Sequence, residues 1–348
     1  MAVRTKINFY KVDDCGFYTN KQHQFTDLKK LLEDLDSFVN QNGYTLVQTK
    51  MFEPTGGEDP LLPVYCMYSK KINQHGDYMV VTWNEIPSNN GQVSSVKPSL
   101  KSGAVDVDFS KLPKNNIPGF AAYYWFVPSQ NVFAILRFGS RVKNGHQGLK
   151  KYLSEYLKNE SSFRDLDTSG EEPVVVGYRP NKTAQSRADI EAKFSSSPWR
   201  KKVQFEKIKN EREKIFRIIR KGEVQLNDPI TRGVWQKMLD VIVGGNSSDS
   251  ADDLLTRRYR FEMDRRLSEK ELEKILEEWG DGDVSDSENV GFVFEKESEK
   301  IYWLSDALAK ADIKLNLVRD NDEIVNYKSL EDELNKKRQD FLNRLQSD

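Results

Sequence analysis

Acidic side chains at two places in the sequence have a spacing that suits Mg²⁺-dependent chemistry. Asp106 and Asp108 alternate along an expected strand at 104–109, so both carboxylates lie on one side of it and can share a magnesium ion. Nucleotidyl transferases place a Gly-Ser turn before such a pair, whereas Gly139–Ser140, the nearest one here, follows it. The transferase pattern is therefore incomplete.

A second acidic motif, Glu191-Ala-Lys193, matches the E-x-K half of a restriction-type nuclease core. That core needs the motif on a buried strand, but residues 188–192 are polar and favour a helix. We therefore expect no catalytic residue. The alternative is a Mg²⁺-dependent, nuclease-type abortive-infection effector that uses Asp106, Asp108 or Glu191.

Other catalytic and cofactor motifs are absent from the sequence. It has no phosphate-binding Gly-rich loop, no nucleophile elbow and no H-E-x-x-H. The acidic loop 281–286 begins like a calcium loop, but it lacks Gly at the sixth position and Glu at the twelfth. Two cysteines, Cys15 and Cys66, cannot provide a four-ligand zinc site by themselves. We expect no metal and no cofactor.

Basic residues that alternate with aromatic ones indicate a nucleic-acid ligand instead. Between Arg200 and Lys221 there are ten Lys/Arg against three Glu, a local charge of +7, and Trp199 and Phe205 lie among them. Such residues contact phosphates and stack on bases. No recognition helix or zinc finger is evident, so we expect backbone-led, sequence-nonspecific binding of double-stranded DNA. The expected DNA-binding residues are Arg200, Lys201, Lys202, Lys207, Lys209, Lys214, Arg217, Arg220, Lys221, Arg257, Arg258 and Arg260.

Length and composition indicate how many domains carry these residues and where in the cell the protein is expected. The chain has 348 residues and a net charge of −1, which conceals opposed basic and acidic segments. At roughly 150 residues per domain this is about two domains. No apolar run reaches the roughly 20 residues that a membrane-spanning helix needs, and the first residues do not form a secretory signal. We therefore expect a cytoplasmic protein.

The pattern of elements predicts an α+β fold, with two mixed α/β domains of antiparallel-rich sheets joined by a basic helical segment. The N-terminal domain covers 1–165 and contains a buried hairpin at 119–138. A connector at 166–250 holds a basic helix, expected to continue through Lys214 and Lys221, and a Gly/Ser-rich flexible loop. The C-terminal domain covers 251–348.

Two helices of the C-terminal domain have clear signals. Ser268 followed by Glu271 is a capping box, which marks the start of a helix. The final helix has Leu330, Leu334 and Phe341 on one side, so we expect it to pack on the core or on a second subunit. A further alternative is a protein-interaction adaptor that works through this helix, which is left if no nucleic acid binds at low salt.

One known family has a similar order of elements. The opening Gly119-Phe120, the strand ends Phe126-Val127 and Arg137-Phe138-Gly139 and the amphipathic helix after them resemble RexA, the cytoplasmic component of lambda-type phage exclusion. Phe17-Tyr18-Thr19 before a Leu-rich helix, and the strand–helix–strand segment 259–294, are similar too. The resemblance extends over about two-thirds of the chain and fails around 193–250.

This resemblance implies a dimeric DNA-binding protein that senses phage replication and signals to an effector, which in the lambda system is a membrane protein. Combined with the basic segments, it leads us to expect a DNA-binding sensor of phage defence (abortive infection or superinfection exclusion). The expected partners are double-stranded DNA, a second copy of the chain and a membrane effector encoded nearby.

Overall fold

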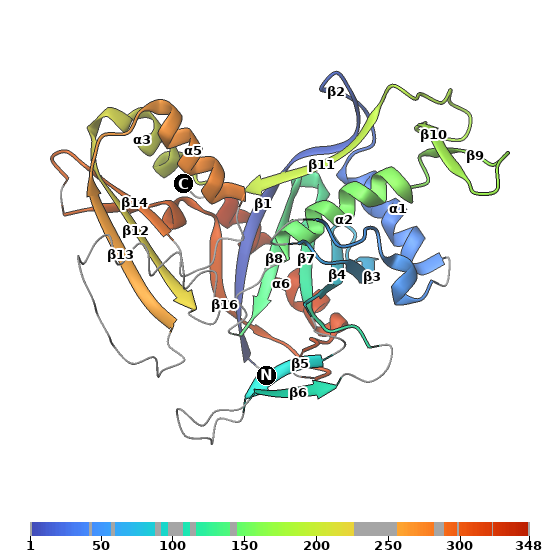
Figure 1. The fold of residues 1–348 in the computed structure, drawn as a ribbon, viewed down its shortest axis with the longest axis horizontal. Helices are drawn as coiled ribbons and strands as arrows, with labels where there is room; N and C mark the ends of the chain where they lie inside the picture. Colours follow the sequence, from blue (N-terminus) through green and yellow to red (C-terminus); the bar gives the residue numbers. More distant parts are fainter. Residues whose placement is uncertain are drawn as a thin grey trace.

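Helices and antiparallel sheets make up the protein, which confirms the predicted α+β class. A computed structural model describes residues 2–41, 44–56, 60–87, 92–96, 107–111, 116–139, 145–225, 256–281, 289–297, 299–321 and 323–346. Two sheets dominate, a large one on the right of Figure 1 and a smaller one on the left.

The main sheet has eight strands, in the order β11-β1-β8-β7-β4-β3, with β2 and β16 also paired to β1. Their bounds are β1 Ala2–Thr19, β2 Gln22–Phe25, β3 Val64–Lys71, β4 Tyr78–Glu85, β7 Gly119–Val127, β8 Val132–Phe138, β11 Glu191–Pro198 and β16 Lys310–Asn316. Strand β1 is long enough to pair with β16 through its first half and with β11 through its second half. Segments more than 300 residues apart in sequence are thereby joined in one sheet.

The predicted hairpin at 119–138 is confirmed as β7 and β8 at the centre of this sheet. Every residue of β8 is buried, and so are Ala121–Val127 of β7. Side chains of a strand alternate between the two faces, so a strand buried on both faces needs an unbroken apolar run. The apolar sequence from Phe120 to Phe138 therefore reflects helices on both faces.

Helices α1 (Leu28–Gln41) and α2 (His146–Asn159) cover one face of the main sheet. The predicted stripe of α1, with Leu28, Leu31 and Leu35, is buried against it. Helix α6 (Tyr327–Gln346) covers the face of the sheet opposite α2 (Figure 1). Its residues Leu330, Leu334, Phe341 and Leu342 are buried there. Because α6 uses its apolar side within its own chain, that side is not available to a partner.

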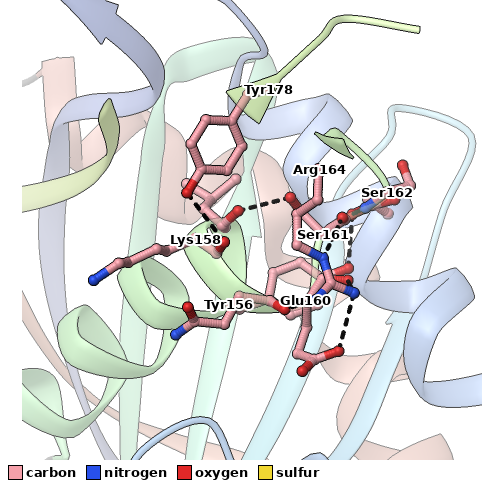
Figure 2. A network of polar contacts seen from close by, with 10 residues as sticks. Tyr156, Lys158, Glu160, Ser161, Ser162, Arg164 and Tyr178 are labelled. Carbon is pink, nitrogen blue, oxygen red and sulfur yellow. Dashed lines mark hydrogen bonds and ion pairs between the residues drawn. The ribbon is translucent and has the colours of Figure 1, made fainter. Parts of the chain in front are cut away.

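Polar contacts close the C-terminal end of α2, where the last backbone carbonyls of a helix have no partner within it. Arg164 donates hydrogen bonds to the carbonyl oxygens of Asn159 and, at 3.1 Å, of Ser161 (Figure 2). The hydroxyl of Tyr178 donates to the carbonyl of Lys158 at 3.2 Å. A cation at this end also interacts favourably with the helix dipole. These contacts hold strands β9 (Arg164–Asp167) and β10 (Val174–Tyr178) beside α2.

The smaller sheet has four strands in the order β13-β12-β14-β15. Their bounds are β12 Ile215–Gln225, β13 Thr256–Asp264, β14 Asn289–Phe294 and β15 Ile301–Trp303. Helices α3 (Lys202–Asn210) and α5 (Glu269–Asp281) pack on one face, and their buried residues Ile208, Leu272 and Leu276 contact Phe292 and Phe294 of the sheet. A separate hairpin consists of β5 (Gln92–Val96) and β6 (Val107–Lys111).

The prediction that the basic helix continues to Lys221 is wrong beyond Asn210. A short 3-10 turn, Arg212–Lys214, follows α3, and strand β12 then pairs with β13 and β14. The spacing of Ile215, Ile218 and Ile219 fits a helix, but β-branched residues also favour strands, and pairing on both sides decides the outcome. The basic segment is therefore half helix and half strand.

The two sheets do not follow the boundaries of the predicted N-terminal domain (1–165), connector (166–250) and C-terminal domain (251–348). Strand β11, in the expected connector, and strand β16 and helix α6, in the expected C-terminal domain, all belong to the main sheet and its covering layer. The smaller sheet takes β12 from the connector and β13 to β15 from the C-terminal range. The predicted flexible loop and the acidic loop 282–288 lie outside the described residues.

The predicted capping box at the start of α5 is confirmed. The backbone N–H of Ser268 donates to the Glu271 carboxylate at 2.9 Å, and the N–H of Glu271 donates to the Ser268 hydroxyl at 3.3 Å. Ser268→Ala removes the second bond, and we expect it to lower the free energy of unfolding by about 1 kcal/mol. Ser268→Thr keeps a hydroxyl that accepts from the Glu271 N–H and donates to its carboxylate, so it should stay close to wild type. Urea titration followed by circular dichroism tests this, and an alanine variant with an unchanged midpoint would contradict it.

Candidate nucleic-acid interface

The expected DNA-binding residues do not form one surface. Arg200 and Lys201 lie where the chain passes from the main sheet to α3, and Arg200 forms an isolated β-bridge with Leu308 on the returning chain. The Arg200 guanidinium donates to the carbonyl of Leu276 at 3.3 Å and lies 4.4 Å from the centre of the Phe205 ring. Arg200 thus stabilises the connection between the main sheet and the smaller sheet with its helices.

The side chain of Lys207 in α3 contacts residues next to and within the smaller sheet. Its ammonium donates to Glu297 at 2.7 Å and to the Tyr302 hydroxyl at 2.8 Å, and it lies 4.5 Å from the centre of the Tyr302 ring. The Glu297 carboxylate, together with that hydroxyl, raises the pKa of Lys207. A lysine held by two residues through three contacts has a structural role, and we remove it from the candidate phosphate contacts.

Two further lysines lie in α3 and in the turn directly after it. Lys209 is exposed near the end of α3, and Lys214 pairs with Glu211 at 3.2 Å. Of Lys202, Arg257 and Arg258 the structure describes only the backbone, in α3 and in β13.

Strand alternation separates the basic residues of β12. Ile218 pairs with Phe292, which contacts the helices, so Arg217, Ile219 and Lys221 share the face opposite α3 and α5. Arg220 belongs to the other face and is exposed. We call the face opposite the helices the outer face. Among the residues whose side chains are described, pairing across the sheet gives it Arg217, Ile219 and Lys221 of β12, Arg260, Glu262 and Asp264 of β13, Asn289, Gly291 and Val293 of β14, and Ile301 and Trp303 of β15.

Of the side chains that the structure describes, three cations and two carboxylates lie on the outer face. Arg217 pairs with Asp264 at 2.5 Å, and Arg260 pairs with Glu262 at 2.7 Å. The Arg260 side chain remains 52% exposed and the Arg217 side chain 35% exposed. Exposed ion pairs of this kind contribute about 0–1 kcal/mol, so phosphates can compete for the arginines.

Trp303 is the residue of this face that sequence reasoning missed. Its indole lies over the backbone of Gly291, since a Cβ added there would come within 2.8 Å of ring atom Cε3. The Lys221 ammonium lies 4.0 Å from the centre of the ring. Trp303 is half-buried. The available signal was the alternation of Ile301-Tyr302-Trp303, which places Tyr302 in the core and Trp303 on the opposite face.

Of the candidate catalytic carboxylates, the structure describes the side chain of Glu191 alone. Asp106 lies outside the described residues, and Asp108 is described only as backbone of β6. Residues 188–192 were expected to favour a helix, but Glu191–Pro198 form strand β11 because they pair with β1 at the edge of the main sheet. Lys193 pairs with Asp14 at 2.7 Å. Within the described ranges, no three His, Cys, Asp or Glu side chains are grouped closely enough to hold a metal ion.

A cavity of about 690 Å³ lies at one end of the main sheet, between the start of α1, the β1–β2 hairpin and two turns. Its walls carry Lys29 and Lys71 but also Asp13 and Asp27, and none of the expected site residues lines it. Cys15 contributes to the cavity, and burial raises the pKa of its thiol. A protonated thiol is a poor nucleophile, and the mixed charges do not select one class of ligand.

Comparisons with protein-family models, with curated proteins and with solved structures find no match for this chain. Among the residues that the structure describes, no helix has an apolar stretch long enough to cross a membrane.

Proposed function

We propose that the protein binds DNA through the outer face of its smaller sheet. The observation that carries this proposal is that Lys221, Arg217 and Arg260 share the outer face with Trp303, whose ring Lys221 contacts. Cations beside an exposed aromatic ring on a sheet are typical of nucleic-acid surfaces, where the cations contact phosphates and the ring contacts bases or sugars.

The geometry favours binding with little dependence on sequence. The cations lie on a sheet face, whereas sequence in B-DNA is read mainly by a helix or a two-stranded ribbon inserted in the major groove. Glu262 and Asp264 hold the two arginines in place and also limit the net charge of the face. We therefore expect moderate affinity that arises from phosphate contacts and falls steeply with salt.

The cellular role is a second step of the proposal, and the resemblance to RexA supports it. By that resemblance, the protein acts in the cytoplasm as a sensor of phage defence, forms a dimer and signals to an effector encoded nearby. The adaptor alternative is less favoured, because the apolar side of α6 is buried within its own chain.

The nuclease alternative gains one observation. Residues 191–198 form a strand, as an E-x-K motif requires, and Lys193 of that strand contacts Asp14 of β1. Glu191 is exposed at the edge of the sheet, however, whereas the nuclease core buries its motif strand. DNA binding therefore remains the better-supported function.

Fluorescence anisotropy with labelled duplexes of about 30 base pairs tests the proposal. At 50 mM salt we expect two unrelated duplexes to bind with similar affinity, with Mg²⁺ or with EDTA, and to remain intact. An absence of binding to both duplexes would contradict DNA binding. Cleavage that requires Mg²⁺ and is lost in Glu191→Gln would establish the nuclease instead.

A further inference from the structure

We propose that the outer face takes unpaired nucleotides, with Trp303 as the stacking platform for a base. This inference rests on the proposed function and names the form of nucleic acid that the site prefers. It starts from the indole itself, which lies on the surface of β14 rather than in the core between the sheet and its helices.

The packing around Trp303 fixes one side of the ring. Only a glycine fits beneath it, because a Cβ at Gly291 would also approach ring atom Cζ3 within 3.0 Å and Ile301 within 2.5 Å. The ring is thus in close contact with the backbone of β14 and cannot sink further into the sheet. An aromatic ring that is held in one orientation loses little conformational freedom when a base stacks on it.

The contact that a base must replace is weak. The Lys221 ammonium lies 4.0 Å from the ring centre, a cation–π contact that at an exposed site corresponds to roughly a 2- to 5-fold effect on an equilibrium constant. Stacking of one base on an aromatic side chain strengthens binding by roughly 5- to 150-fold. Stacking is therefore the stronger interaction, and the displaced ammonium can contact the adjoining phosphate.

The neighbouring cations are placed to follow a strand of nucleic acid. Lys221 and Arg260 are paired across β12 and β13, and Trp303 lies two strands from β12 on the other side. With neighbouring strands about 4.8 Å apart, Arg260 and Trp303 are roughly 14 Å apart across the sheet, enough for more than one nucleotide. Bases in a duplex are already stacked on one another, so only unpaired bases gain the contact with Trp303.

The test compares single strands that differ only in their bases. We would titrate wild-type protein into a labelled 12-nucleotide oligothymidine, an abasic oligomer with the same number of phosphates, and a duplex. We expect the oligothymidine to bind at least 5-fold more tightly than the abasic oligomer. Equal affinity for these two single strands would overturn the inference while leaving the proposed function intact. Failure of all three ligands to bind at 50 mM salt would overturn both.

Two variants of Trp303 make the assignment residue-specific. Trp303→Leu keeps an apolar cover over Gly291 but cannot stack, so we expect it to bind oligothymidine and the abasic oligomer with similar affinity. Trp303→Phe should retain most of the preference. If Trp303→Leu is folded by circular dichroism and still prefers oligothymidine as wild type does, stacking on Trp303 is excluded.

Discussion

Replacing Asp77 with alanine is expected to lower the free energy of unfolding by about 3–5 kcal/mol, the usual cost of leaving a buried charge without its partner. Asp77 is fully buried just before β4. The Arg338 guanidinium of α6 donates to its carboxylate through two nitrogens, at 2.7 and 3.0 Å. Trp125 at 3.3 Å and Asn73 at 3.0 Å complete its set of donors.

The size of this effect follows from what the carboxylate holds together. Asp77 is the polar link between the centre of the main sheet and α6, whose Phe341 packs against Trp125 with ring centres 5.7 Å apart. Without Asp77, the Arg338 charge remains at the buried contact with no carboxylate to neutralise it. Urea unfolding should show a midpoint shifted to lower concentration.

An exposed ion pair provides the matched control. Lys29 and Glu33 lie on the surface of α1, 3.8 Å apart, with side chains 61% and 50% exposed. Glu33→Ala should change the free energy of unfolding by less than about 1 kcal/mol. If Asp77→Ala and Glu33→Ala unfold at the same urea concentration, the link between Asp77 and α6 does not stabilise the fold.

Local signals in the sequence were sufficient for several elements. The leucine spacing of α1, the apolar hairpin at 119–138 and the capping box of Ser268 depend on residues within a few positions of one another. For such elements neighbouring residues and long-range packing favour the same structure. Their predictions were confirmed.

Long-range pairing explains what the sequence could not predict. Strand β1 pairs with Lys310–Asn316, about 300 positions away, and no local pattern indicates this partner. The isoleucines of β12 fit a helix as well as a strand, and only β13 and β14 decide between the two. The same holds for the edge strand β11, which forms on β1 despite its polar sequence.

The candidate site was predictable in composition and not in detail. A surplus of Lys and Arg marked the part of the chain that contains strand β12 of the outer face, but the carboxylate that pairs with Lys207 is Glu297, 90 positions away. Charge counts along the sequence cannot show that this lysine is already neutralised. Trp303 was missed for the same reason, because its neighbour Lys221 belongs to a distant strand.

The second large effect concerns DNA affinity. We expect the combined substitution of Arg217, Lys221 and Arg260 by alanine to weaken binding of a duplex by roughly 100-fold or more at 50 mM salt, because up to three phosphate contacts are lost. A control variant removes three exposed cations in α3, in the turn after it and in α5, namely Lys209, Lys214 and Lys270. Both variants change the net charge by the same amount, so only the position of the cations differs.

The dependence of affinity on salt tests the central claim most directly. For B-DNA, log K falls linearly with log salt, with a slope of about 0.9 for each phosphate neutralised. We predict that the variant lacking Arg217, Lys221 and Arg260 has a slope shallower by up to about 2.7, while the control variant keeps the wild-type slope. An unchanged slope in the outer-face variant, together with a shallower slope in the control, would place the DNA on the helix side and contradict the account.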